Sequence, residues 1–342
     1  MLLCFRYGSY LSEEQLAELV RPRPDVLDLV RAWLEHHGIR PSSISISHGG
    51  SWLTVTDVLV SQANQLLGAA YQLYRNSKTN DTIIRTVGYA LPKVLHSHIQ
   101  TVAPTTYFPS TRRTRQTSRR RSSGVAPATE KVMTARQLLQ PGLTPSSLRW
   151  LYQTDVYRPS EPYRSKIGVL GFFDDYPSQL DLTEFMTRYR SDGIDAKFTV
   201  EQWNGGGYNP DNPDDLANLG IQYAAAITYP TPLVFYSVGG NREWDRYDRI
   251  LAEDMDLVWI NKLLIESSPP QTIIIGYGEP EQNLPPGYAL SVCDLYAKLG
   301  VRGITVLVAS GQDGVGDGDC VNADGIVQFM PEFPSSCTCS VL

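Results

Sequence analysis

Two adjacent carboxylates, Asp214 and Asp215, open the stretch with the clearest potential for acid-base chemistry. The residues that follow, through Ile227, have the apolar spacing of a helix. An Asp at a helix start accepts hydrogen bonds from the free amides of the first turn. A general base must instead reach the proton that it abstracts, and successive helix residues point about 100° apart. We therefore expect Asp214 and Asp215 to cap the helix or face solvent.

Three further groups have the residue types of a metal site. His96 and His98 would share one side of a strand, but a third ligand is lacking, so we expect a surface pair. The loop 317–325 holds three aspartates, yet it fails the ligand and glycine spacing of an EF-hand. Cys337 and Cys339 lack the partners that zinc needs. We predict no metal and no cofactor.

Composition predicts a globular protein of one to three domains. The 342 residues are 42% hydrophobic and 19% charged, with a net charge of -6, which implies no bulk attraction to nucleic acid or membrane. No run of about 20 apolar residues suits a membrane span, and Met1–Phe5 is too short for a signal peptide. The five cysteines fit one or two bridges in a secreted protein, with no pairing predicted.

Residues 104–143 read as a basic linker. Arginines stand among serines and threonines at positions 112, 113, 115, 119, 120 and 121. Such composition is typical of a solvated, disordered tether, and a dibasic processing site is the alternative. Nucleic-acid binding is disfavoured because no aromatic platform accompanies the arginines. Asn80-Asp81-Thr82 is a glycosylation sequon that matters only in a secreted chain.

The elements on either side of the linker differ in pattern. Before it, helices are predicted from Ser12 to Val20, from Val26 to Gly38 and after Ser61, with strands at 52–56 and 82–88. After it, strands alternate with helices, which favours a doubly wound parallel sheet. The predicted strands are 166–172, 198–200, 233–238, 272–275 and 304–308, and the predicted helices are 182–190, 215–227, 249–266 and 288–299.

The run from Asp214 to Tyr223 also resembles the catalytic helix of sedolisins, the acid-acting serine-carboxyl peptidases that include tripeptidyl-peptidases. In that family the run reads roughly Glu-Ala-Asn-Leu-Asp-Ile-Gln-Tyr, and the Glu and Asp share one helix face. The Glu is the general base for a serine and the Asp supports it. Here Leu216 and Gly220 stand at those positions. The family's oxyanion Asp corresponds to Gln312, which can donate through its amide.

The resemblance extends from about Phe5 to Cys337. Residues 1–103 are similar to the sedolisin propeptide, which implies a ferredoxin-like pro-domain; the matching segments are Tyr7-Gly8, Leu11–Glu14, Trp52–Val55, Leu67–Ala69, Tyr74-Arg75 and Gly88–Pro92. Residues 144–342 resemble a truncated subtilisin-like domain, through Thr144–Arg149, Tyr277-Gly278 and Gly300–Gly303. The implied substrate-pocket candidates are Tyr229, Pro230, Thr231, Pro232, Gly239, Gly240, Ser310 and Gly311.

In the family, the nucleophilic serine and the calcium loop lie downstream of Ser336, and this chain stops at Leu342. The resemblance thus implies a peptidase homologue that has lost proteolysis. A regulatory or inhibitory module for an active sedolisin or a peptide is one alternative, and a pocket repurposed for small-molecule chemistry is another. Family resemblance implies secretion although no signal peptide is present. A truncated sheet would expose an edge, so we expect dimerisation or poor solubility.

Overall fold

The computed structural model describes residues 8–47, 49–75, 82–106, 108, 143–159, 165–172, 174–239, 255–311, 314 and 326–338. Two compact units make up the chain. The first contains Met1–Arg112, Gly240–Pro269 and Tyr277–Leu342, and the second contains Arg113–Gly239 and Pro270–Gly276. The linker arginines, Asn80 and Asp81 of the sequon, the loop 317–325, Cys339, Gly240 and Gln312 lie outside the described residues.

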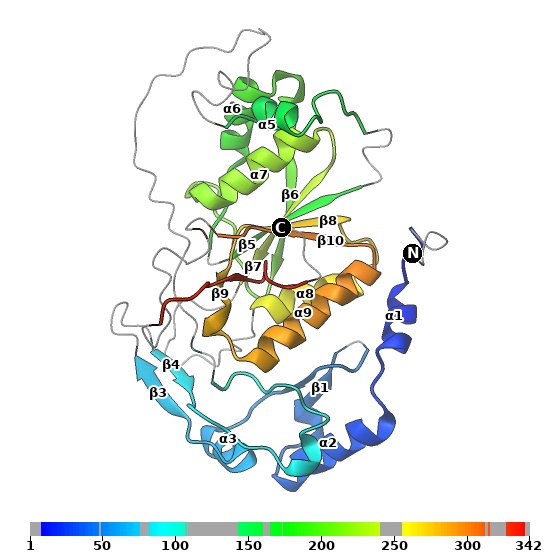
Figure 1. Cartoon of the computed structure of the whole chain (residues 1–342), viewed down its shortest axis with the longest axis vertical. Helices are drawn as coiled ribbons and strands as arrows, with labels where there is room; N and C mark the ends of the chain where they lie inside the picture. Colours follow the sequence, from blue (N-terminus) through cyan, green and yellow to red (C-terminus); the bar gives the residue numbers. More distant parts are fainter. Residues whose placement is uncertain are drawn as a thin grey trace. The chain divides into compact units, whose positions relative to one another are not determined.

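The N-terminal part of the first unit is a small α/β arrangement (Figure 1). Its elements are α1 (Glu13–Leu19), α2 (Pro24–His36), β1 (Ile44–Ile46), β2 (Leu53–Val55), α3 (Val60–Leu67), β3 (Gln72–Arg75) and β4 (Thr82–Arg85), with short 3-10 turns at Pro41–Ser43 and Lys93–Leu95. The strands pair as two antiparallel ribbons, β1 with β2 and β3 with β4. Val30, Leu34, Ile39 and Leu95 form its buried core.

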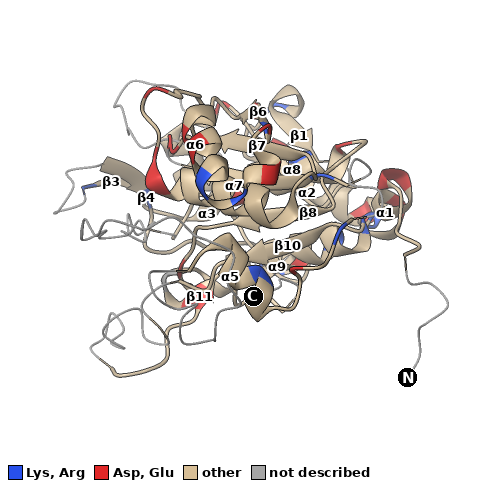
Figure 2. Ribbon diagram, turned by 90° about the horizontal axis from the view of Figure 1, so that it is seen from above, with Lys and Arg blue, Asp and Glu red and all other residues tan. Residues whose placement is uncertain are grey.

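The predicted capping box at the start of α1 is confirmed. The Gln15 amide donates to Ser12 Oγ at 3.2 Å, and the Ser12 amide donates to Gln15 Oε1 at 2.9 Å. Glu13 and Glu14 occupy the first turn, where negative charge complements the helix dipole, and Figure 2 shows acidic residues on α1. The sequence therefore fixes both the start and the polarity of this helix.

The rest of the first unit comes from the C-terminal half of the chain. Its elements are α8 (Met255–Ile265), β9 (Glu279–Pro280), a 3-10 turn at Glu281–Asn283, α9 (Pro286–Val301), β10 (Thr305–Val308) and β11 (Glu332–Phe333). The helix that we predicted over 249–266 is described only from Met255 onward. Trp259 and Tyr296 are completely buried and meet edge to face, with ring centroids 5.7 Å apart. Within the described residues, no helix has the length and apolarity required to cross a bilayer.

Tyr296 gives this unit a specific response to alkaline pH. Its hydroxyl is buried without a hydrogen-bond partner in the described part of the chain, and burial, with Asp256 nearby, raises its pKa well above 10. A tyrosine of the unfolded chain loses its proton near pH 10, whereas the folded one does not, so stability falls above pH 10. We expect Tyr296→Phe to match the wild type at pH 7 and to lose less stability between pH 9 and 11. Urea denaturation of the wild type and the variant at pH 7, 9 and 11 tests this. An equal loss of unfolding free energy between pH 9 and 11 in the two proteins would contradict it.

The second unit is an α/β fold with a parallel sheet, as predicted. Its elements are α5 (Pro145–Leu151), β5 (Ile167–Phe172), α6 (Gln179–Tyr189), a 3-10 turn at Ser191–Gly193, β6 (Phe198–Trp203), α7 (Asp215–Thr228), β7 (Leu233–Val238) and β8 (Thr272–Ile275). The strands β8, β5, β7 and β6 lie side by side in that order, and all three pairings are parallel. α6 and α7 bury their apolar faces against Val169 and Phe235 of this sheet.

Gly171 of β5 makes room for a core side chain of the neighbouring strand. A Cβ at Gly171 would lie 2.1 Å from Cζ of Phe235, whose ring is fully buried. We expect Gly171→Ala to cost about 3 kcal/mol of unfolding free energy, at the upper end for overpacking. Phe235→Leu should absorb much of that cost in the double variant, because it removes the opposing ring atoms. A double-mutant cycle by urea denaturation checks this, and strict additivity would refute it.

Candidate functional site

Of the two carboxylates at the start of α7, Asp214 caps the helix and Asp215 faces solvent, the two outcomes that the sequence predicts. Asp214 Oδ1 accepts a hydrogen bond from the Leu216 amide at 2.9 Å. The Asp214 amide itself donates to the Tyr176 carbonyl at 2.9 Å. Asp215 is exposed in the first turn. Asp214 is therefore committed to the backbone, and Asp215 points to solvent.

Leu216 and Gly220 lie on the flank of α7 that faces the sheet. A Cβ built on Gly276, just after β8, would lie 3.5 Å from Cδ1 of Leu216. A Cβ built on Gly220 would lie 3.0 Å from Cγ1 of Val169 in β5. The first position therefore presents hydrocarbon, and the second admits a side chain only if the buried Val169 shifts. Neither position offers a group that can accept a proton.

Asn218, which lies between Leu216 and Gly220 in the sequence, links α7 to α6. Asn218 donates to Asp181 Oδ2 at 2.7 Å and accepts from the Ser178 amide at 2.9 Å. The Ser178 hydroxyl in turn accepts from the Asp181 amide at 3.2 Å and caps α6. The carboxylate of Asp181 is thus bound within a helix-helix contact and is not directed at an open site.

Gly239 lies at the carboxyl ends of the parallel strands, the edge where ligands of such sheets bind. Asn204, in a left-handed conformation with φ 50°, donates from Nδ2 to the Gly239 carbonyl at 2.8 Å. A Cβ on Gly239 would lie 2.3 Å from the Asn204 carbonyl and 2.4 Å from the Gly206 amide nitrogen. The loops after β6 and β7 therefore touch backbone to backbone, and this contact requires glycine at position 239.

The segment Tyr229–Pro232 lies at the other edge of the sheet. It precedes β7, and the Ile167 amide at the start of β5 donates to the Pro232 carbonyl at 3.0 Å. β7 separates it from Gly239, and a strand of six residues spans roughly 20 Å. The structure therefore does not bring Tyr229, Pro230, Thr231 and Pro232 together with Gly239. The hydroxyl of Tyr229 instead donates to Asp195 Oδ1 at 2.7 Å.

In the first unit, Ser310 and Gly311 are exposed directly after β10. Sequence reasoning missed the carboxylate beside them. A Cβ on Gly311 would lie 3.6 Å from Oε2 of Glu332, and one on Gly278 would lie 2.9 Å from Oε1 of the same residue. The Glu332 carboxylate thus lies against the loops at Gly278 and Gly311, two segments that the family resemblance includes. No short motif marks it, because the contact depends on residues far apart in the chain.

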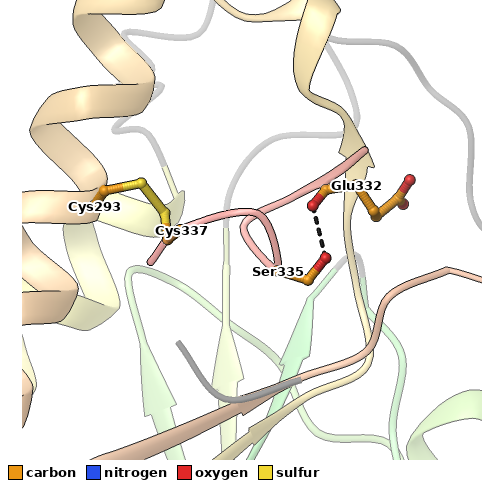
Figure 3. Close-up of a disulfide and its surroundings, with 4 residues drawn as sticks. All are labelled: Cys293, Glu332, Ser335 and Cys337. Atoms are coloured by element: carbon orange, nitrogen blue, oxygen red, sulfur yellow. Dashed lines mark hydrogen bonds between the residues drawn. A yellow bond between two sulfur atoms is a disulfide. The ribbon is translucent and has the colours of Figure 1, made fainter. Parts of the chain in front are cut away.

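The segment after Glu332 holds that residue in place (Figure 3). Its carbonyl accepts hydrogen bonds from the Ser335 hydroxyl at 2.7 Å and from the Ser336 amide at 2.9 Å. Cys337 is bonded to Cys293 of α9. β11 also pairs with β9, where Glu332 lies opposite Pro280. Within the described residues, no group of three His, Cys, Asp or Glu side chains could hold a metal ion.

Comparison with known proteins supports the resemblance seen in the sequence. A family model described as "Pro-kumamolisin, activation domain" matches residues 4–108. Tripeptidyl-peptidase SED2 of Arthroderma otae is 29% identical over 350 residues, and the alignment covers 97% of this chain and 57% of that protein. Tripeptidyl-peptidase SED3 of the same organism is 29% identical, with 97% and 56% covered. The chain belongs to the sedolisin family.

The two tripeptidyl-peptidases are longer than this chain. The chain spans a little over half of the length of each. Among solved structures, "Pseudomonas sedolisin (serine-carboxyl proteinase) complexed with two molecules of pseudo-iodotyrostatin" aligns with 58% of this chain and 52% of its own, at 15% identity and a TM-score of 0.40. That similarity is too weak to define the fold, so the α/β architecture rests on the parallel sheet itself.

Proposed function

We propose that this sedolisin homologue has lost peptide hydrolysis. The observation that carries the proposal is the pair Leu216 and Gly220, which occupy the flank of α7 at the positions of the family's catalytic Glu and Asp. A serine nucleophile needs a base that takes its proton, and hydrocarbon cannot do so. Of the two carboxylates that precede Leu216 in the sequence, Asp214 binds a backbone amide and Asp215 is exposed in the first turn. In the same proposal the first domain is ferredoxin-like and the later one subtilisin-like.

The direct test is an assay of the purified chain with tripeptide amide substrates between pH 3 and 7. Tripeptidyl-peptidase SED2 of Arthroderma otae serves as the positive control under the same conditions. We expect no turnover above the buffer blank at any pH. Turnover by the wild-type chain that survives repurification, and that Leu216→Ala changes, would show that the site retains chemistry.

A second proposal is that the chain binds and regulates an active sedolisin or a peptide. The match of residues 4–108 to an activation domain favours it, because the same chain also carries a helix without the catalytic carboxylates. Titration of the chain into an active tripeptidyl-peptidase at acid pH would then give dose-dependent inhibition. Unchanged activity at a hundredfold molar excess would remove this candidate.

The same proposal includes an extracellular location as its first further statement and self-association as its second. An extracellular location is supported by the Cys293–Cys337 disulfide, because disulfides persist in oxidising compartments. Self-association through a sheet edge is the second, and light scattering of the purified chain tests it. A monodisperse monomer at 100 µM would argue against association.

A further inference from the structure

The end of α5 and the loop after it, residues 150–158 of the second unit, are exposed at every position. Five of these nine residues are apolar or aromatic, and their exposed fractions lie between 45% and 81%. They are Trp150, Leu151, Tyr152, Val156 and Tyr157. A single apolar side chain on a surface is ordinary, whereas a group of them marks an interaction site.

This exposed stretch is held in a defined shape. The Thr154 amide donates to the Arg149 carbonyl at 2.7 Å, and Arg149 Nη2 donates back to the Thr154 carbonyl at 3.3 Å. The same nitrogen donates to the Asp155 carbonyl at 2.7 Å. Gln153 has a left-handed conformation with φ 56°, which costs energy and persists only where the surrounding contacts impose it. A surface that is ordered before binding loses less entropy when its partner binds.

Positive charge gathers at the same place. Arg158 Nη1 also donates to the Asp155 carbonyl, at 2.9 Å, so the guanidinium groups of Arg149 and Arg158 share one acceptor. Burial lowers the pKa of Arg149, and the charges of Arg190 and Arg158 lower it further. Asp192 and Asp155 oppose this shift, and Asp192 Oδ1 accepts from Arg190 Nε at 2.7 Å.

Arg149 and Arg158 lack a matching anion in the described part of the chain, where neither forms an ion pair with a carboxylate. Two like charges that share an acceptor repel each other, and a carboxylate from outside would relieve this repulsion. Guanidinium groups bind carboxylates through strong, charge-assisted hydrogen bonds. The positive charge at this surface therefore favours an anionic partner.

The two features together select the chemistry of that partner. Its carboxylates would complement the arginines, and its apolar side chains would cover Leu151 and Val156. A nucleic acid would satisfy only the charges, because bases stack on aromatic rings and not on aliphatic side chains. The chain as a whole has a net charge of -6, so complementary charge directs an acidic partner to this surface.

We propose that residues 149–158, the α5 surface, bind an acidic polypeptide segment that also carries apolar side chains. The arginines bind its carboxylates, and the five exposed apolar and aromatic side chains contact its apolar residues. This binding does not depend on whether the chain hydrolyses peptides, and it involves none of the candidate pocket residues.

Fluorescence anisotropy of the full chain with labelled peptides tests the proposal. The probe is a fluorescein-labelled peptide of twelve residues in which glutamates alternate with leucines and phenylalanines. One comparison peptide has lysines in place of the glutamates, and another has serines in place of the apolar residues. We expect a Kd below 100 µM for the probe and binding at least tenfold weaker for the other two. No saturable binding of the probe at 1 mM, or equal binding of all three peptides, overturns the proposal.

Variants of the chain show whether the α5 surface is the binding site. Arg158→Glu should raise the Kd of the probe at least tenfold and should tighten binding of the lysine peptide, a gain that mere damage to the loop would not give. Val156→Ser should raise the Kd of the probe at least threefold. The matched controls Lys197→Glu and Leu180→Ser, at exposed positions elsewhere in the second unit, should leave it within twofold. Equal effects of the surface and control variants would contradict the assignment.

Competition separates the peptide from other anionic partners. A twelve-residue oligouridylate and phosphatidylserine vesicles are each added to the complex of the chain with the labelled peptide. We expect neither to displace the peptide. Displacement by one of them, accompanied by direct binding of that ligand that Arg158→Glu removes, would assign the surface to that ligand and overturn the proposal. Self-association of the chain that Arg158→Glu abolishes would likewise assign it to a second copy.

Discussion

We expect a large loss of activity when leucine and glycine replace two residues of tripeptidyl-peptidase SED2 of Arthroderma otae, those that align with Leu216 and Gly220. The kcat/KM of that enzyme should fall about 10³-fold or more. A positioned general base contributes roughly 10²–10⁴ to such reactions, and the base and its supporting group act as one unit. The single Leu substitution should therefore cost nearly as much as the double one. Steady-state kinetics on a tripeptide amide at acid pH measures the effect.

The control is a substitution on the same helix that avoids the catalytic flank. In this chain Leu219 is 38% exposed and lies one residue before Gly220. Alanine at the aligned position of the active relative should change kcat/KM less than threefold, with similar melting temperatures for all variants. The double variant of the relative carries leucine and glycine at the two aligned positions. If it keeps a tenth or more of its kcat/KM, these positions do not account for a loss of catalysis in this chain.

Much of the fold follows from local sequence rules. Ser12 and Gln15 form the predicted capping box, and Asp214 caps α7 as its position suggested. The continuous apolar runs at 167–172 and 233–238 became adjacent parallel strands because a strand buried on both faces needs apolar residues at every position. These features depend on residues within one or two helical turns of each other, or on a single strand.

The rest depends on contacts between distant residues that periodicity cannot predict. Tyr229–Pro232 and Gly239 are close in sequence, yet they lie at opposite ends of β7, a separation that the family resemblance did not reveal. Glu332 meets Gly278 and Gly311 only because β9 and β11 pair. The pairing of Cys293 with Cys337 was left open for the same reason, since spacing alone does not choose a connectivity.

The second large effect is expected from that disulfide. Cys293 and Cys337 are 44 residues apart, and closing a loop of this size removes about 4 kcal/mol of chain entropy from the unfolded state in the loop-closure account. The double variant Cys293→Ala/Cys337→Ala should therefore lose about 2–4 kcal/mol of unfolding free energy. Urea denaturation with and without dithiothreitol measures it. Reduced wild type should match the variant, and the variant should not respond to reductant.

The loss should also reach the loop around Gly311. The bond fixes Cys337, two residues after the Ser335 hydroxyl that holds the Glu332 carbonyl, so its removal loosens β11 at one end. Hydrogen exchange at the Ser336 amide, which donates to the same carbonyl, should then accelerate more than exchange within α6 of the second unit. Ser335→Ala separates the two effects, because it removes the hydrogen bond from the hydroxyl to the Glu332 carbonyl, worth about 1 kcal/mol, and leaves the covalent link intact. If the cysteine variant and Ser335→Ala accelerate exchange equally, the hydrogen bond holds Glu332 and the disulfide acts only on the unfolded chain.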